Sequence, residues 1–180
     1  SQEVDIRAKP RTRQVAVVLG VGGTIDIFGN NFPPHQASLM IGAEYRAREG
    51  RYGAFDLGVK VPLEFLQSWQ NAGLLLNLRG VLSPVPRLPL ELVLSLDVGF
   101  AAMSYTSAAP FSTKWPCATP SYLPSCTVYA MRAVPALSVA YRFVPGFEMR
   151  AQLAGFELNV SQPMFDPRLA FGLQAAYRFY

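Results

Sequence analysis

The chain has 180 residues, of which 51% are hydrophobic, and a net charge of +4 from sixteen basic and twelve acidic residues. This length suits one domain, and no stretch reaches the roughly 18 consecutive apolar residues that a membrane-spanning helix needs. Outside the N-terminal segment the basic residues are dispersed, which argues against a nucleic-acid partner. Fifteen prolines and fourteen glycines disfavour helices, so strands are the expected elements.

Residues 1–13 are polar and contain the only cluster of basic residues, Arg7, Lys9, Arg11 and Arg13. They lack the apolar core of a secretory signal peptide. We therefore interpret the chain as the mature form of an exported protein from which a signal peptide was cleaved. Residues 1–13 then form a tail, and 14–180 the folded domain.

From residue 14 onward, apolar and polar residues alternate with a period of two, as in strands with one apolar and one polar face. We expect eight strands, at 14–28, 37–47, 52–65, 72–82, 88–103, 128–143, 147–160 and 168–180. Short turns at 48–51, 83–87 and 144–146 alternate with longer loops at 29–36, 66–71, 104–127 and 161–167. The pattern predicts an all-β fold, an eight-stranded antiparallel up-and-down barrel with its long loops at one end.

Three positions interrupt this alternation. The seventh strand keeps its pattern only by slipping one residue near Ala154–Gly155, which predicts a β-bulge there. Pro62 and Pro135 each remove a hydrogen-bond donor within a predicted strand, so we expect bulges or strand ends at both prolines.

The two faces of the predicted strands differ completely in charge. One face is apolar and contains no charged residue, whereas the other carries acids and bases in equal number, separated by glycine and alanine. Balanced charge, a preference for arginine and small spacers suit the crowded interior of an eight-stranded barrel. Glu148, Glu157, Arg168 and Arg178 lie on this polar face. On the same face we predict an interior charge network of Asp26, Glu44, Arg46, Asp56, Lys60, Glu64, Arg79, Glu91, Asp97, Arg132, Arg142 and Arg150.

Aromatic residues gather at both ends of the apolar face. Near the short turns they are Tyr45, Phe55, Tyr141, Phe143, Phe147, Tyr177 and Phe179, and near the long loops Phe65, Trp69, Phe100, Tyr129 and Phe171. Two aromatic belts around an apolar band are typical of membrane interfaces. They favour a transmembrane barrel over the alternative, a soluble barrel with its polar face outward.

The last predicted strand, Arg168 to Tyr180, alternates as far as Phe179 and ends in aromatic residues. This ending resembles the C-terminal strand of Gram-negative outer-membrane β-barrels, with Tyr180 as one extra residue. With its length and loop asymmetry, the chain is similar to the small eight-stranded barrels of the OmpA, OmpX and OmpW type. The resemblance implies an outer-membrane location, contact with outer-membrane lipid, and a periplasmic side for both termini, so that 1–13 becomes a periplasmic tail.

The resemblance leaves function open, because that family includes anchors, adhesins, solute conduits and lipid-modifying enzymes. We expect a non-enzymatic structural or interaction protein with a closed, ion-paired interior and no cofactor. The first alternative is a narrow conduit for small or apolar solutes. The second is a lipid-modifying enzyme.

His35, the sole histidine, is the one candidate for enzyme chemistry. It lies in the first predicted loop, three residues before Ser38. The lipid-modifying barrels of the family have a His and a Ser two residues apart on a strand, or a first-loop His with an Asp-Ser pair in the second loop. Here the second predicted loop offers Ser68 without an adjacent acid. We therefore interpret His35 as a polar rim residue and assign no catalytic or metal-binding residue.

The longest predicted connection, 104–127, is the candidate interaction surface. It contains the aromatic residues Tyr105, Phe111, Trp115 and Tyr122, and both cysteines of the chain, Cys117 and Cys126. In an exported protein the cysteines would form a disulfide worth roughly 2–3 kcal/mol, whereas two free thiols are the alternative. Exposed aromatics on a stiffened loop are a binding-site signature, so we predict contact with another envelope or extracellular protein. The alternative is a rigid cap over the barrel mouth.

Overall fold

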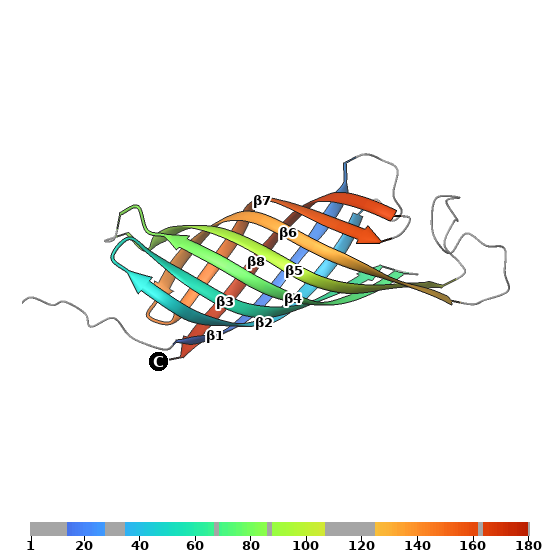
Figure 1. Ribbon diagram of the computed structural model, residues 1–180. Helices are drawn as coiled ribbons and strands as arrows, with labels where there is room; N and C mark the ends of the chain where they lie inside the picture. Colours follow the sequence, from blue (N-terminus) through green and yellow to red (C-terminus); the bar gives the residue numbers. More distant parts are fainter. Residues whose placement is uncertain are drawn as a thin grey trace, which may run out of the picture.

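A computed structural model of the chain describes residues 14–27, 35–66, 69–85, 88–106, 125–161 and 164–179. Eight antiparallel strands pair in chain order, and the last strand closes onto the first to complete a barrel (Figure 1). The predicted all-β, up-and-down transmembrane barrel is confirmed. The strands are β1 (Val15–Asp26), β2 (His35–Gly50), β3 (Gly53–Leu66), β4 (Trp69–Leu82), β5 (Leu90–Thr106), β6 (Ser125–Val144), β7 (Phe147–Ser161) and β8 (Met164–Phe179).

Within the described part of the chain, no helix is long and apolar enough to cross a membrane.

The predicted asymmetry of loop length is only partly correct. Residues 27–34 and 107–124 separate their strands widely, but only 67–68 separate β3 from β4 and only 162–163 separate β7 from β8. On the other end, 83–89 between β4 and β5 is longer than either. Pairing continues through polar positions such as Gln70 and Asp166, because a backbone ladder does not require alternating side chains. Alternation therefore underestimates the length of the strands at the end of the barrel where long loops were predicted.

The short-turn end holds both ends of the described barrel. The start of β1 and the end of β8 lie at the same end as the turn between β2 and β3 (Figure 1). β6 and β7 are joined by the two-residue turn 145–146. Gly146 adopts a φ of 89° there, a left-handed conformation that favours glycine.

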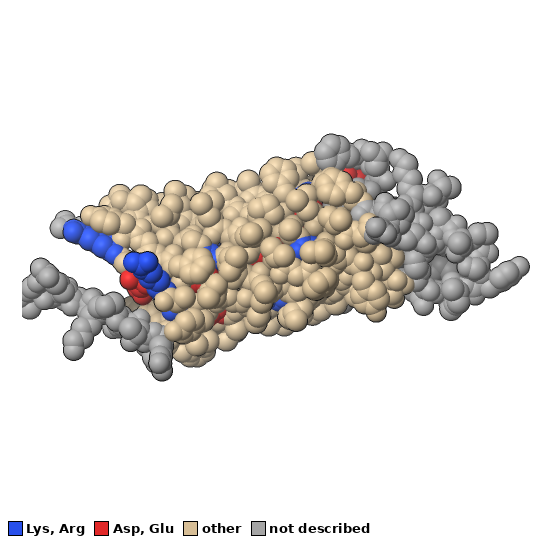
Figure 2. All heavy atoms as spheres, viewed as in Figure 1, with Lys and Arg blue, Asp and Glu red and all other residues tan. Residues whose placement is uncertain are grey.

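The barrel is apolar outside and polar inside. Large outward side chains such as Leu76 and Leu94 are 64% and 56% exposed, whereas Asp56 and Arg79 are 0% and 1% exposed. Uncharged residues dominate the flank of the barrel in Figure 2. A soluble monomer rarely exposes so large an apolar surface, but a bilayer requires one. The charged face is therefore the inner face.

Aromatic rings cluster on the outer face at the short-turn end. The ring centroids of Tyr141 and Phe143 are 4.8 Å apart, those of Phe143 and Phe147 6.0 Å, and those of Tyr177 and Phe179 5.0 Å. These rings are amphipathic or apolar and suit the level at which hydrocarbon meets headgroups.

The bulge predicted in the seventh strand is confirmed. The register of β7 shifts against β6 and against β8 in the region between Gln152 and Phe156. Pro62 and Pro135 lie inside β3 and β6, so the strand ends expected there are wrong. The β3–β4 pairing is interrupted at Val61 and Pro62, and the β6–β7 pairing at Val134 and Pro135, but each resumes in the same register. Neither proline is itself the site of a bulge, although the register shift between Leu137 and Ser138 follows Pro135 by two residues. Each proline removes one donor, and the long paired segments on both sides hold the register.

An arginine placed in the apolar band should destabilise the barrel strongly. Leu94→Arg, at an outward position paired with Gly80 and Leu137, should lower the free energy of unfolding by about 2–4 kcal/mol because the charge enters hydrocarbon. The matched control, Val144→Arg at the end of β6, should cost about 1 kcal/mol or less near the interface. Urea titrations in lipid vesicles measure both, and equal costs would contradict the membrane orientation.

Candidate functional site

Charged side chains from most strands converge inside the barrel. The period of two places alternate residues of each strand inward, and register aligns them: Arg46 of β2 stands opposite Asp56 of β3, which stands opposite Arg79 of β4. Side chains in such a row are near neighbours on one face. We define the short-turn cluster as Glu44, Arg46, Asp56, Arg79, Glu148, Arg150 and Arg178.

Arg150 links β7 to β2 across the lumen. Its Nη1 and Nη2 donate to Oε1 and Oε2 of Glu44, both at 2.7 Å, and its Nε donates to Oε1 of Glu148 at 2.7 Å. A planar guanidinium that meets both oxygens of a carboxylate forms the strongest type of charged hydrogen-bond pair. β2 and β7 are not neighbours in the barrel, so this pair bridges the interior space.

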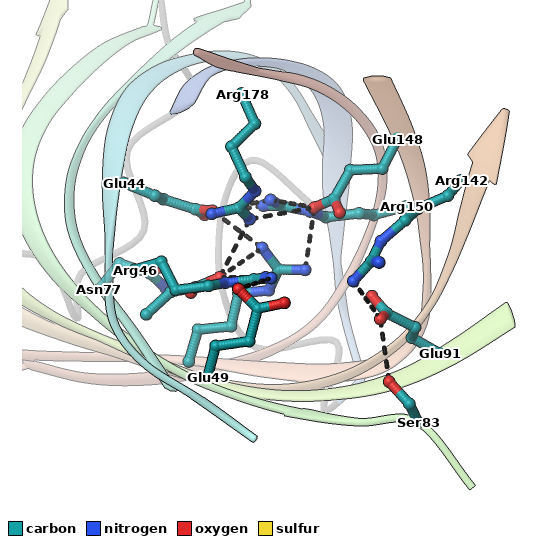
Figure 3. Close-up of polar contacts among 12 residues, drawn as sticks. Glu44, Arg46, Glu49, Asn77, Ser83, Glu91, Arg142, Glu148, Arg150 and Arg178 are labelled. Atoms are coloured by element: carbon teal, nitrogen blue, oxygen red, sulfur yellow. Dashed lines mark hydrogen bonds and ion pairs between the residues drawn. The ribbon is translucent and has the colours of Figure 1, made fainter. Parts of the chain in front are cut away.

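Asp56 accepts hydrogen bonds from three arginines. Arg46 donates to it through Nε at 2.8 Å and Nη2 at 3.3 Å, Arg79 through Nη1 at 3.2 Å, and Arg178 through Nη2 at 3.1 Å. Arg79 also donates to Oε2 of Glu44 at 2.9 Å and to Oε1 of Glu148 at 3.0 Å. Figure 3 shows the labelled members of the cluster converging from different walls of the barrel.

Every member of the short-turn cluster is at most 6% exposed. Four guanidinium groups meet three carboxylates, so the cluster carries one excess positive charge by this count. Buried charges are tolerated only when they are paired and hydrogen-bonded. The cluster is therefore one interdependent unit: removing a carboxylate adds to the uncompensated positive charge, and removing an arginine takes hydrogen-bond donors from buried carboxylates.

A second group of polar contacts lies further along the strands, toward the long loops. Arg132 donates to Oε1 of Glu64 at 2.6 Å and to Oδ1 of Asn159 at 2.9 Å, and its Nη2 lies 3.2 Å from Oε1 of Glu157. Asn71 donates to Oε2 of Glu64 at 2.6 Å. These residues form the loop-side cluster, which links β3, β4, β6 and β7.

Lys60 and Asp97 lie between the two clusters. The Nζ of Lys60 is 3.2 Å from both carboxylate oxygens of Asp97, and Asn77 donates to Oδ1 of the same carboxylate. Along β3, Asp56, Lys60 and Glu64 thus contribute in turn to the short-turn cluster, this central pair and the loop-side cluster.

Three predicted network residues lie at the margins of the interior. Arg142 donates to Oε1 of Glu91, which also accepts a hydrogen bond from the Ser83 hydroxyl at 3.0 Å. The Glu91 side chain is 4% exposed but that of Arg142 is 43% exposed, so this pair lies at the short-turn rim, apart from the cluster (Figure 3). Asp26, at the end of β1, stands opposite Arg168 of β8 and is partly buried.

Two cavities lie on opposite sides of the short-turn cluster. One of about 200 Å³ is lined at the rim by residues that include Ala54 of β3. The other, of about 80 Å³, is lined further inside by Pro62 and Glu64 of the same strand, and by Gly20 and Gly22 of β1. Asp56 lies between these positions on β3, so the cluster separates the two spaces.

Several sequence-predicted site residues lie outside the described residues. These are Phe111, Trp115, Cys117 and Tyr122, so the disulfide and the interaction surface stay predictions. Tyr105 and Cys126 belong to β5 and β6, where their backbones are register partners. His35 is the first residue of β2 instead of a residue of the predicted loop, because β2 begins earlier than the alternation indicated. Among the described residues, no group of three or more acids, His or Cys is arranged to hold a metal ion.

Sequence reasoning missed the uncharged partners of the network. Asn71, Asn77 and Asn159 are at most 4% exposed, and each donates a hydrogen bond to an interior carboxylate. The sequence did indicate their position, because each asparagine is an even number of residues away from a charged residue of its strand and so lies on the same face. Amides carry no charge, so a search for balanced charge does not find them.

No protein-family model and no curated protein sequence matches this chain. Its fold is similar to that of Ail, the attachment invasion locus protein of Yersinia pestis, with a TM-score of 0.59 and 12% identity over 93% of this chain and 99% of that one. Neisserial surface protein A gives a TM-score of 0.56 and 11% identity over 92% and 95%. A major outer membrane protein from Thermus thermophilus gives 0.58 and 13% over 93% and 100%.

The chain therefore has the fold of the small eight-stranded outer-membrane barrels. The resemblance inferred from its alternation and its last strand is confirmed at the level of fold. At these identities the similarity carries no residue roles, so the function has to be argued from the interior and the rims of this barrel.

Breaking the lumen-spanning pair should destabilise the protein. Arg150→Gln leaves Glu44 and Glu148 short of their main donor in a buried site and should lower the free energy of unfolding by about 3–5 kcal/mol. Arg48→Gln is the matched control, since this guanidinium is exposed at the rim and should contribute about 1 kcal/mol or less. Urea unfolding in detergent micelles compares the two. Similar effects would show that the buried cluster contributes no more than an exposed rim arginine.

Proposed function

We propose that this protein is a non-enzymatic outer-membrane barrel with a closed interior, which acts as a structural or interaction protein through its external loops. The observation that carries the proposal is the short-turn cluster, whose hydrogen bonds cross the lumen between strands that are not neighbours. A barrel whose interior is filled by paired charges is suited to hold its shape and present its ends. The apolar outer face and the fold similarity support the outer-membrane location.

The orientation is part of this proposal and rests on the short turns, which outer-membrane barrels have on the periplasmic side. We place the short-turn end, with residues 1–13 and the C-terminus, on the periplasmic side, and the 104–127 connection on the cell exterior. Export with a cleaved signal peptide is part of this proposal. The interaction residues remain Tyr105, Phe111, Trp115 and Tyr122, with a Cys117–Cys126 disulfide that stiffens the loop.

The partner of this loop is proposed to be another envelope or extracellular protein. Ail, which shares the fold, is an attachment invasion locus protein, and one of its structures is a complex with the heparin analogue sucrose octasulfate. These properties are those of Ail. They support the general idea that a small barrel of this fold serves as a platform for binding.

A narrow conduit is the second candidate, because cavities lie on both sides of the short-turn cluster. In that case the cluster would have to open for solutes to pass. A lipid-modifying enzyme is the third candidate. It would need a catalytic partner for His35, which lies at the start of β2.

Conductance measurements distinguish the proposal of a closed barrel from that of a conduit. In planar bilayers the purified protein should show no steady ohmic conductance, because the buried ion pairs block the lumen. The double variant Glu44→Ala/Arg150→Ala should show current steps, since it removes the lumen-spanning pair, and Arg142→Ala should behave like the unmodified protein. A stable open channel in the unmodified protein would overturn the closed-interior proposal in favour of the conduit.

Removing the long loop tests the interaction role separately from the fold. Deleting 108–125 should leave the barrel intact, because β5 and β6 remain paired from Leu90 and Tyr141 up to Met103 and Val128. Folded barrels keep a closed ladder in SDS until heated, so a heat-dependent shift in gel mobility measures folding. Cross-linking on intact cells measures the contacts. A deletion variant that keeps the same cross-linked partners would contradict the assignment to 104–127.

A further inference from the structure

Among the side chains whose burial the structure describes, exposed charge is confined to one rim of the barrel. The exposed charged residues of this set are Arg48, Glu49, Arg51 and Arg142, and all four lie in or beside the short turns. In Figure 2, basic and acidic atoms project at this end, beyond the mostly uncharged flank. Three of these four residues are arginines, so the rim is basic.

A β-bulge places Arg48 on the lipid-facing side of the barrel. The register between β2 and β3 shifts between Arg46 and Arg48, so that Arg46 stands opposite Asp56 but Arg48 stands opposite Phe55. Residues opposite one another share a face, and Phe55 is 41% exposed on the outer face. Without the bulge, Ala47 would stand opposite Phe55, and strict alternation would turn Arg48 inward like Arg46.

Arg51 adds a second exposed arginine in the turn between β2 and β3. Its guanidinium carbon lies 5.3 Å from the ring centroid of Tyr52, whose side chain is 58% exposed. With Tyr45 and Phe55 on the outer face of the same two strands, these rings mark the interfacial level of a bilayer. Arg48 and Arg51 therefore lie at the depth of lipid headgroups.

The positive charge of these two arginines is not neutralised within the described residues. Arg142 is paired with Glu91, and Glu49 lies 3.7 Å from Arg46 of the short-turn cluster. Among the described carboxylates none is an ion-pair partner of Arg48 or Arg51. Two unneutralised guanidinium groups, three residues apart in the chain and both at headgroup depth, attract an anion from the membrane surface.

We propose that Arg48 and Arg51 form a binding site for the phosphate group of an anionic phospholipid in the leaflet at the short-turn end. Guanidinium groups match phosphate oxygens by paired hydrogen bonds, and the outward position of Arg48 lets a lipid reach it from the bilayer. A phosphatidylglycerol headgroup has a net negative charge, whereas a choline headgroup adds a cation that this basic rim repels. The site rests on the proposed membrane location.

The test compares lipids retained by the full-length protein. The protein is incorporated into nanodiscs that contain equal amounts of phosphatidylglycerol and phosphatidylcholine, and the lipids that remain bound are counted by native mass spectrometry. The unmodified protein should retain phosphatidylglycerol in preference. Arg48→Gln and Arg51→Gln should each lower this preference roughly fivefold, the factor expected for one basic residue near an anionic membrane surface.

Matched variants separate this site from general charge effects. Arg142→Gln removes the same charge from the same rim, but its guanidinium is already paired with Glu91, so the preference should change less than about twofold. Arg48→Lys should keep most of the preference, because the positive charge remains. Equal preference in the unmodified protein and in the Arg48→Gln/Arg51→Gln variant would overturn the proposal, as would a loss in Arg142→Gln as large as that in Arg48→Gln.

The source of the phosphate is tested with soluble competitors. If inorganic phosphate or glycerol 3-phosphate displaces phosphatidylglycerol from the protein, the site binds a free anion and the lipid assignment is overturned. No displacement supports a membrane lipid. Protein that inserts into nanodiscs without lipid preference overturns this site alone, whereas protein that does not insert at all overturns the proposed membrane location and the site with it.

Discussion

Closure of the hydrogen-bond ladder is the constraint on which the rest of this structure depends. β8 pairs with β1 from Val15 and Phe179 to Asp26 and Arg168, so no strand edge remains. In hydrocarbon an unpaired backbone group costs several kcal/mol, because no water replaces the missing partner. Closure then forces each strand to present alternate residues to lipid and to lumen. The apolar exterior and the charged interior are both consequences of this closure.

The small lumen makes the interior charges interdependent. Eight strands enclose a space that side chains nearly fill, so Glu44, Asp56 and Glu148 obtain their hydrogen bonds from arginines instead of bulk water. Arginine suits this role because one planar group reaches several carboxylates at once. Arg79 alone contacts all three. The result is a plug formed by side chains from strands that are distant in sequence, with one cavity on either side of it.

Local departures from alternation carry information that the regular pattern does not. The bulge in β7 accommodates a shift against both neighbours, whereas the bulge in β2 turns one arginine from the lumen to the lipid side. Whether one residue is paired or bulged thus decides which of two environments a charge enters. Pro62 and Pro135, by contrast, interrupt the pairing with one neighbouring strand only, and the register resumes unchanged directly beyond each proline.

The sequence by itself determined the fold class, the number of strands, the face that each strand turns to the lipid, and most of the charged residues inside. Alternation with a period of two is a local property, so the inward phase of Glu44, Arg79 or Glu148 can be read from neighbouring residues. Only the tertiary structure decided which charges meet, because Arg150 and Glu44 are 106 residues apart and their contact depends on barrel register. It also decided that Arg142 lies at the rim and that Arg48 faces outward, since strand ends and bulges depend on pairing between strands.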